Sequence, residues 1–171
     1  MATNKVYFMS VDYLRDETVI NGNVDAEVLE PFILIAQNVH IESITGTNLY
    51  NKIISDLEAV SITGNYKILL DDYIHPALLQ WSLYEALPFI NYKLTNKSIS
   101  TKDSDNSDSI DLSELTYLRQ SVRDVAEYYS QRAISYLKDN TDLFPEYLSN
   151  GDDCSDIGTS NNAYFSGVQF D

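Results

Sequence analysis

The sequence predicts an all-α protein: a small helical bundle with a polar loop or ragged hairpin inserted, and with flexible arms at both termini. Two long stretches, residues 65–91 and 112–140, repeat apolar residues at steps of three and four, which is the spacing of one helix face. Residues that begin or end helices stand at matching places, with Ser10 and Asp25 before apolar runs and Gly46 after one. At 171 residues the chain has the length of one domain with tails.

The chain divides into an N-terminal arm over residues 1–9, a helical domain over residues 10–147 and a C-terminal tail over residues 148–171. Val6, Tyr7 and Phe8 are the apolar part of the arm. Ser10 is expected to cap a short helix over residues 11–17, because its hydroxyl can accept a hydrogen bond from a first-turn N–H.

A longer helix is expected over residues 26–43, capped by Asp25. Two neighbouring apolar stripes run along it, Val28, Phe32, Ile35 and Val39 in one and Leu29, Ile33 and Ala36 in the other. Gly46 should end this helix, and Thr47 should cap the next one, over residues 47–58.

The central helix is expected over residues 65–91, and it is apolar on nearly all sides, which predicts burial by its own domain or by copies of itself. It holds Trp81, the single tryptophan, which should be largely buried. Pro76 lacks an N–H and clashes with the carbonyl four residues earlier, so we expect a kink or break near His75 and two helical pieces in line. Pro88 should act in the same way near the end.

Residues 95–111 are polar and carry no helical periodicity. They form a ragged hairpin involving Leu94 and Ile99, or otherwise a polar loop. A connection of this length is usually functional or disordered, and we expect it to leave the helical body and touch a neighbouring subunit or the next ring of an assembly. The candidate partner contacts in this region are Tyr92, Lys93, Thr95, Asn96 and Lys97.

The last helix is expected over residues 112–140. Its apolar stripe consists of Leu115, Leu118, Val122, Val125, Tyr129, Ala133 and Tyr136. Arg119, Arg123, Glu127 and Gln131 are expected to face away from this stripe, and Arg123 and Glu127 have the spacing of an ion pair.

The tail begins as a linker and ends in an apolar segment. The candidate contacts in this segment are Tyr164, Phe165, Val168 and Phe170. Two interpretations stand: the segment docks onto a partner, or it folds back onto its own domain.

Composition limits the function. A net charge of −15 and a pI near 4.2 disfavour tight binding to nucleic acid or to anionic lipid, whereas they suit a surface along which DNA slides without sticking. The 13 tyrosines are typical of protein–protein interfaces, or they replace Phe at half-buried positions. A single cysteine, no apparent signal peptide and no apolar run that could span a bilayer predict an intracellular, soluble protein.

The sequence offers no convergent set of catalytic or metal-binding residues, and no cofactor is expected. Cys154 lies in the tail, away from a fixed base. His40 is interpreted as a structural histidine, and Glu85 as an acid that pairs with Arg119, Arg123 or Arg132. The acidic residues of the polar loop begin like a calcium loop, but Asp108 occupies the position of its required glycine.

Four segments together carry a family resemblance, namely FMSVDYLRDETVINGNVD, QNVHIESITGTNLYNKI, LLDDYIHPALLQWSLYEALPFINYKLTNKS and LTYLRQSVRDVAEYYSQRAISYLKDN. Over residues 7–147 the chain resembles the head-to-tail adaptor proteins of tailed bacteriophages, closest to the crAss-like group. The resemblance implies a structural virion protein that forms a ring, commonly twelve-fold, beneath the portal. Its partners would be its own copies, the portal protein and the next tail component, with DNA passing through the channel. It would be found in the host cytoplasm during assembly and then in the virion.

Two classes of function are therefore expected. The first is the structural adaptor, which needs no active site. The second is a small soluble helical enzyme or regulatory protein with an unrecognised site.

Overall fold

The computed structural model describes residues 5–18, 20, 24–90, 92–95, 98–101 and 112–148. The elements in chain order are α1 (Val11–Asp16), α2 (Ala26–Ala36), the π-helical segment η1 (Gln37–Ile41), α3 (Glu42–Thr45), α4 (Thr47–Glu58), α5 (Gly64–Ile68), the π-helical segment η2 (Leu69–Ile74), α6 (His75–Ile90), β1 (Tyr92–Thr95), β2 (Ser98–Thr101), α7 (Leu112–Asp139), the 3₁₀ turn η3 (Thr141–Leu143) and α8 (Pro145–Leu148). The all-α class is confirmed, and a single small hairpin is the β structure of the described part.

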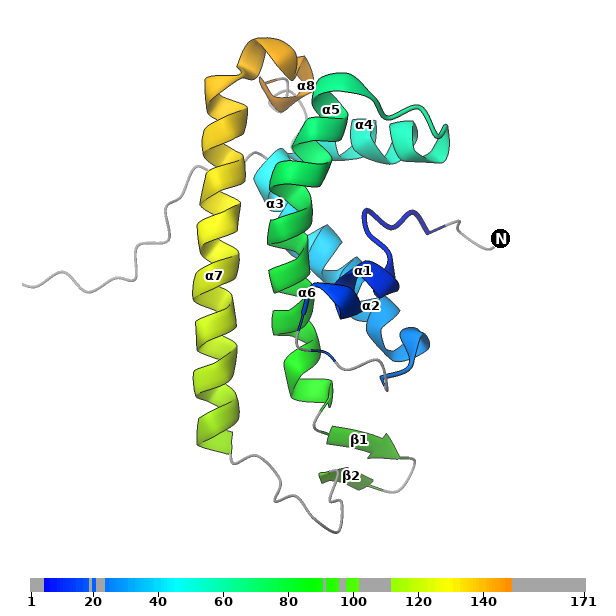
Figure 1. The fold of residues 1–171 in the computed structure, drawn as a ribbon, viewed down its shortest axis with the longest axis vertical. Coiled ribbons are helices and arrows are strands. Elements are labelled where there is room, and N and C mark those ends of the chain that lie inside the picture. Colours follow the sequence, from blue (N-terminus) through cyan, green and yellow to red (C-terminus); the bar gives the residue numbers. More distant parts are fainter. Residues whose placement is uncertain are drawn as a thin grey trace, which may run out of the picture.

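The helices form three layers, with α6 in the middle. It packs against α7 on one side and against α2 on the other, and α1 lies over α2 (Figure 1). The hairpin stands at the end of the body where α6 ends, and α8 stands at the opposite end with α4 and α5. This position between two layers explains why α6 is apolar nearly all round, since both of its sides are buried within its own domain.

The central helix is continuous from Gly64 to Ile90, so of the kink or break expected near His75 the break was wrong, and the irregularity that lies there is the π-helical segment η2. Pro76 has no N–H for the carbonyl of Asp72. The helix adapts by widening into η2, in which the His75 N–H bonds the carbonyl of Leu70, five residues earlier. The Arg132 guanidinium of α7 donates to the Asp72 carbonyl oxygen at 3.1 Å, which gives that oxygen a partner. Pro88 also lies within the helix, which ends two residues later.

The N-terminal arm is held against the body from Val6 onward, although the expected domain boundary stood at residue 9. Phe8 and Met9 are buried in the main core. The buried amide of Gln37 accepts a hydrogen bond from the Phe8 N–H at 2.9 Å and donates to the Val6 carbonyl at 3.1 Å, as a neighbouring strand would. His75 contacts the Phe8 carbonyl through Nε2 at 2.7 Å. The two side chains that hold the arm lie at the π-helical segments, because Gln37 is the first residue of η1 and His75 directly follows η2.

Two of the four predicted helix-ending residues, Ser10 and Gly46, act as expected. Asp25 stands at the N-cap position of α2, but its side chain makes no cap hydrogen bond. The Ser10 hydroxyl accepts from the Tyr13 N–H at 3.1 Å. Gly46 ends α3 with φ of 74°, a conformation that glycine adopts readily. Thr47 is not a cap, however: it is the first residue of α4, and its hydroxyl donates to the Glu42 carboxylate at 3.0 Å.

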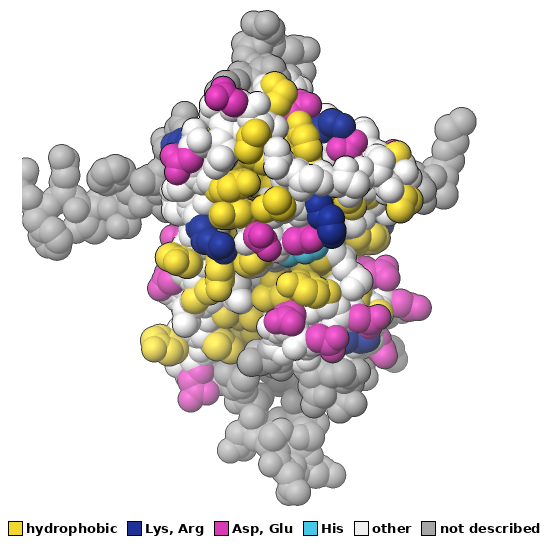
Figure 2. All heavy atoms as spheres, turned by 45° about the horizontal axis from the view of Figure 1, so that its top comes forward, with side chains coloured by type: hydrophobic (Ala, Val, Ile, Leu, Met, Phe, Trp, Pro, Cys, Tyr) yellow, Lys and Arg dark blue, Asp and Glu magenta, His cyan; other side chains and the backbone are white. Residues whose placement is uncertain are grey.

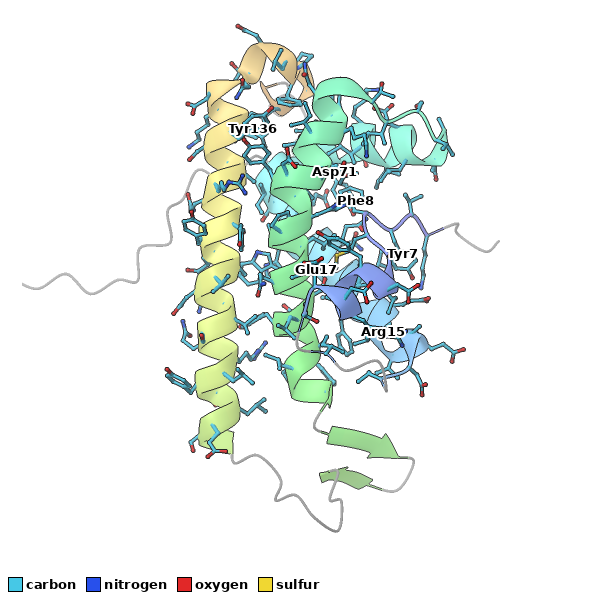
Figure 3. The ribbon with its side chains drawn as sticks, viewed as in Figure 1. Tyr7, Phe8, Arg15, Glu17, Asp71 and Tyr136 are labelled. Carbon is cyan, nitrogen blue, oxygen red and sulfur yellow. The ribbon has the colours of Figure 1, made fainter. Side chains whose placement is uncertain are left out.

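Side-chain contacts fix α1 and the α8 end of the body. The Arg15 guanidinium donates to the Val24 carbonyl, just before α2. Figure 3 shows Arg15 on the side of the body where α1 and α2 lie, and Tyr136 on α7 beside the central helix. Tyr136 stacks on Tyr73 of η2 with ring centroids 3.9 Å apart. At the same end, the Tyr66 hydroxyl donates to Glu146 of α8 at 2.7 Å, and burial together with this bond raises the pKa of Tyr66 to about 12.

Candidate interaction surfaces

Of the two interpretations of residues 95–111, the structure supports the hairpin, whose strands lie at residues 92–95 and 98–101, while residues 96–97 and 102–111 lie outside the described residues. β1 and β2 are antiparallel, and Leu94 is paired with Ile99. Of the candidate contacts in this region, Tyr92, Lys93 and Thr95 lie in β1. Asn96 and Lys97 lie outside the described residues, as do Tyr164, Phe165, Val168 and Phe170 of the tail. The hairpin thus remains a candidate contact at one end of the body (Figure 1).

The α2 helix and the first residues of η1, which include Val39, present an apolar face to solvent. Of the two predicted stripes, the one made by Leu29, Ile33 and Ala36 is fully buried, whereas Val28, Ile35 and Val39 are 45%, 42% and 57% exposed. Phe32 stacks on Phe89 of α6 at a centroid distance of 5.1 Å, and Phe89 is itself 47% exposed. We call Val28, Phe32, Ile35, Val39 and Phe89 the α2 face.

The α7 helix presents a second apolar face. Within its predicted stripe, Leu115 and Ala133 are buried, but Leu118 and Val125 lie at the edge and are 40% and 41% exposed. Tyr117 and Tyr128 lie beside them and are 79% and 66% exposed. We call Tyr117, Leu118, Val125 and Tyr128 the α7 face. Large exposed apolar groups gathered on one helix face usually mark a contact with a partner.

The predicted ion pair on α7 is confirmed, but the predicted outward orientation was wrong for Arg119. Arg123 donates to the Glu127 carboxylate at 2.7 Å, as its spacing predicts. Arg119 instead turns toward α6, with its guanidinium carbon 4.1 Å from the ring centroid of Tyr84. A cation over an aromatic ring is a favourable contact, and it covers the partly buried Tyr84.

A view of the molecule with its α8 end tilted forward shows how these side chains are distributed. Figure 2 shows apolar side chains in patches on both sides of a band of acidic and basic side chains, with a histidine within the band. One cluster of charged side chains lies on the central helix, where Lys67 is 2.7 Å and His75 Nδ1 is 3.7 Å from the Asp71 carboxylate. The visible surface is therefore mixed, and it is apolar over sizeable areas.

His40 and Glu85 form a partly buried polar contact between η1 and α6. His40 Nε2 lies 3.0 Å from a Glu85 carboxylate oxygen, and the His40 ring stacks on Trp81 at 3.7 Å with an interplanar angle of 4°. The Trp81 Nε1–H donates to the Ser130 hydroxyl at 2.9 Å, which in turn donates to the Ala126 carbonyl. Glu85 thus pairs with a histidine, and the expected arginine partner was wrong.

This arrangement joins three layers through one tryptophan, because His40 comes from η1, Trp81 from α6 and Ser130 from α7. Burial lowers the pKa of His40, although the hydrogen bond and the charge of Glu85 oppose that effect. The imidazole has one ring face covered and one nitrogen engaged, so the arrangement favours a structural role. Sequence spacing could not show the pair, since the two residues are 45 positions apart.

Other kinds of site have little support in the described part of the chain. A shallow hollow of about 520 Å³ lies between the arm and α2, and Tyr7, Met9, Asp12 and Glu30 are among its lining residues. Among the residues described, no group of three or more His, Cys, Asp or Glu is placed to hold a metal ion. Within the same residues, no helix is long and apolar enough to cross a membrane.

Comparison with known proteins gives one match. The model of a family of unknown function, DUF6712, matches residues 41–157, which is more than half of the chain. No curated protein matches the chain significantly, and no solved structure does.

Proposed function

The chain belongs to DUF6712, a family of unknown function, and we propose that it is a structural virion protein, a head-to-tail adaptor of a tailed bacteriophage. It assembles into a ring beneath the portal, extends the DNA channel and provides the platform for the next tail component. The observation that carries this proposal is the presence of two exposed apolar faces on separate helices of one small domain. A subunit inside a ring touches two neighbours and needs two such faces.

The charge of the chain agrees with this role. With a net charge of −15 the subunit offers few cations that could bind phosphates. The exposed apolar groups of α2 and α7 lie outside the core. A ring of such subunits would surround DNA with an acidic wall, which repels the DNA backbone and keeps it from sticking as it passes.

The ends of the body suit axial partners. The hairpin stands at one end and α8 at the other (Figure 1), and the tail that carries Tyr164, Phe165, Val168 and Phe170 continues after α8. We assign the hairpin and this tail segment to contacts above and below the ring, with the portal protein on one side and the next tail or ring protein on the other.

A genetic experiment tests the role. A phage that carries a stop codon early in this gene should assemble DNA-filled heads but no tailed, infectious virions, and a plasmid copy of the gene should restore them. A matched control places a synonymous change at the same codon. Normal tailed virions from the stop-codon phage would exclude the adaptor role.

A further inference from the structure

The two apolar faces have the spacing of helices that pair along a seam. In the α2 face, Val28, Phe32, Ile35 and Val39 follow one another at steps of four, three and four. In the α7 face, Leu118, Val125 and Tyr128 follow at steps of seven and three, and the polar Ser121 occupies the position between the first two. Steps that alternate between three and four keep one side of a helix facing a partner helix over several turns. Each face is therefore suited to a helix laid along it.

The two faces lie at the same height on the body, as contacts with α6 show. Trp81 stacks on His40 from the α2 side and donates to Ser130 of α7 on its other side. Further along α6, Tyr84 contacts Arg119 of α7, and Phe89 contacts Phe32 of α2. The segment of α6 from Trp81 to Phe89 is thus flanked by both faces.

The same contacts give the directions of the helices. Along α2 and η1, Phe32 precedes His40, while their partners Phe89 and Trp81 run the other way along α6. Along α7, Ser130 precedes Tyr136, while their partners Trp81 and Tyr73 again run the other way. Both helices run in the opposite sense to the central helix, so α2 and α7 run in the same general direction on opposite sides of it, with α2 inclined to α7 (Figure 1).

A ring of many subunits preserves these directions. Neighbours in such a ring differ by a small rotation, so an α2 helix that meets the α7 helix of the next copy meets it in the same direction, at the inclination that the two helices have within one chain, and without an axial shift. Val28 then lies beside Leu118, and Val39 lies beside Tyr128. A contact of this kind uses two different surfaces and repeats from copy to copy until the ring closes.

Charge favours this contact over a symmetric one. Residues 26–45, which span α2 to α3, carry Glu27, Glu30 and Glu42 and no lysine or arginine. A two-fold pairing of α2 with α2 would bring these acids together without a cation, and like charges in proximity repel. The α7 helix carries equal numbers of basic and acidic residues: Arg119, Arg123, Arg132 and Lys138 against Glu114, Asp124, Glu127 and Asp139.

We infer that the α2 face of one copy packs in the same direction, at equal height, against the α7 face of a second copy, and that this heterologous contact builds the ring. The inference rests on the proposed function for the closure of the ring. The surface contact itself is a property of the chain and can be tested without any phage component.

Cysteine cross-linking tests the partner and the direction together. In a Cys154→Ser background, one chain carries Val39→Cys and another carries Tyr128→Cys. The mixture, oxidised at high concentration or on portal rings, should give a covalent dimer, and each variant alone should give none. A third chain with Val28→Cys, mixed with Tyr128→Cys, is the control for an antiparallel contact and should lose the dimer band.

Each alternative result overturns the inference. Dimers from Val39→Cys alone would indicate a symmetric α2 contact, and dimers from Val28→Cys with Tyr128→Cys in preference to Val39→Cys would indicate an antiparallel one. Absence of every cross-link from a chain that binds portal would refute the interface and leave the adaptor role standing. Cross-links at the predicted pair in a chain that never binds portal would support the interface and refute the adaptor role.

Charged substitutions provide a second readout. Ile35→Asp and Val125→Asp should each abolish the assembled species in sedimentation while the helical circular dichroism is unchanged, because both side chains are exposed in the single chain. Val60→Asp is the matched control, since Val60 is 92% exposed and lies outside both faces. Assembly that tolerates both face substitutions, or that Val60→Asp blocks equally, contradicts the inference.

Discussion

Replacing Trp81 by alanine should cost about 4 kcal/mol of folding free energy. The side chain is 8% exposed, and truncating a buried aromatic residue costs about 3–5 kcal/mol because it removes buried surface and leaves a cavity. Two further contacts act within that total. These are the hydrogen bond to Ser130 at 2.9 Å, worth about 1 kcal/mol, and the stack on His40, worth about 0.5–1.5 kcal/mol.

Urea denaturation followed by circular dichroism measures this cost. With a slope of about 1–3 kcal/mol/M for a domain of this size, a loss of 4 kcal/mol lowers the midpoint by roughly 2 M. Trp81→Phe keeps a ring against His40 but loses the Nε1–H, so it should cost about 1–2 kcal/mol. Tyr128→Ala is the control, because Tyr128 is 66% exposed and its loss should change the stability of the single chain by at most about 0.5 kcal/mol. Equal midpoints for Trp81→Ala and Tyr128→Ala would refute a central role for α6.

Three further predictions concern pH, backbone strain and the tail. Burial lowers the pKa of His40 and of His75 in the folded state, so the unfolded chain binds protons at a higher pH than the folded chain does. The contribution of both histidines to the free energy of unfolding is therefore complete above about pH 6.5. It is lost as the pH falls toward the folded-state pKa. A His40→Gln, His75→Gln double variant should flatten that dependence in urea titrations, and an unchanged slope would count against it. Val60 is β-branched and 92% exposed, and it adopts φ of 51°, which strains any residue with a Cβ. Val60→Gly should therefore raise the free energy of unfolding by about 1 kcal/mol, and Val60→Ala is the control that keeps a Cβ. A loss of stability in Val60→Gly would contradict this account. Truncation after Asn162 removes Tyr164, Phe165, Val168 and Phe170. The shortened chain should keep its melting temperature but should no longer bind portal rings in a pull-down. Full binding would exclude a docking role, and a much lower melting temperature would show that the tail packs on the core.

Much of the fold follows from local rules in the sequence. The expected helices over residues 26–43, 47–58, 65–91 and 112–140 match continuous helical segments to within about two residues at each end. Apolar periodicity and helix-ending residues such as Gly46 act within a few positions of each other, so the sequence alone contains them. The Arg123–Glu127 pair is local in the same way.

The remaining features depend on contacts between distant segments. Periodicity shows that α2 has two apolar stripes, but only the position of α6 decides that Leu29, Ile33 and Ala36 are buried and that Val28, Ile35 and Val39 are exposed. The helix tolerates Pro76 because η2 widens and because Arg132 of α7 reaches the Asp72 carbonyl.

The candidate surfaces were accessible to sequence reasoning only in part. The hairpin was one of two interpretations of the polar stretch after α6, and the structure describes it. The tail segment, named from its cluster of aromatic residues, lies outside the described residues and stays a prediction. The α7 face was missed, because Leu118 and Val125 fit the buried stripe by spacing, and because exposed Tyr117 and Tyr128 have no periodic signal of their own.

Electron microscopy of the purified chain mixed with portal rings from the same genome tests the adaptor role most directly. The account predicts an additional closed ring coaxial with the portal, in which the long helix of each copy lies against α2 of its neighbour. Portal rings without added density, under conditions where the chain is folded and in excess, would contradict it.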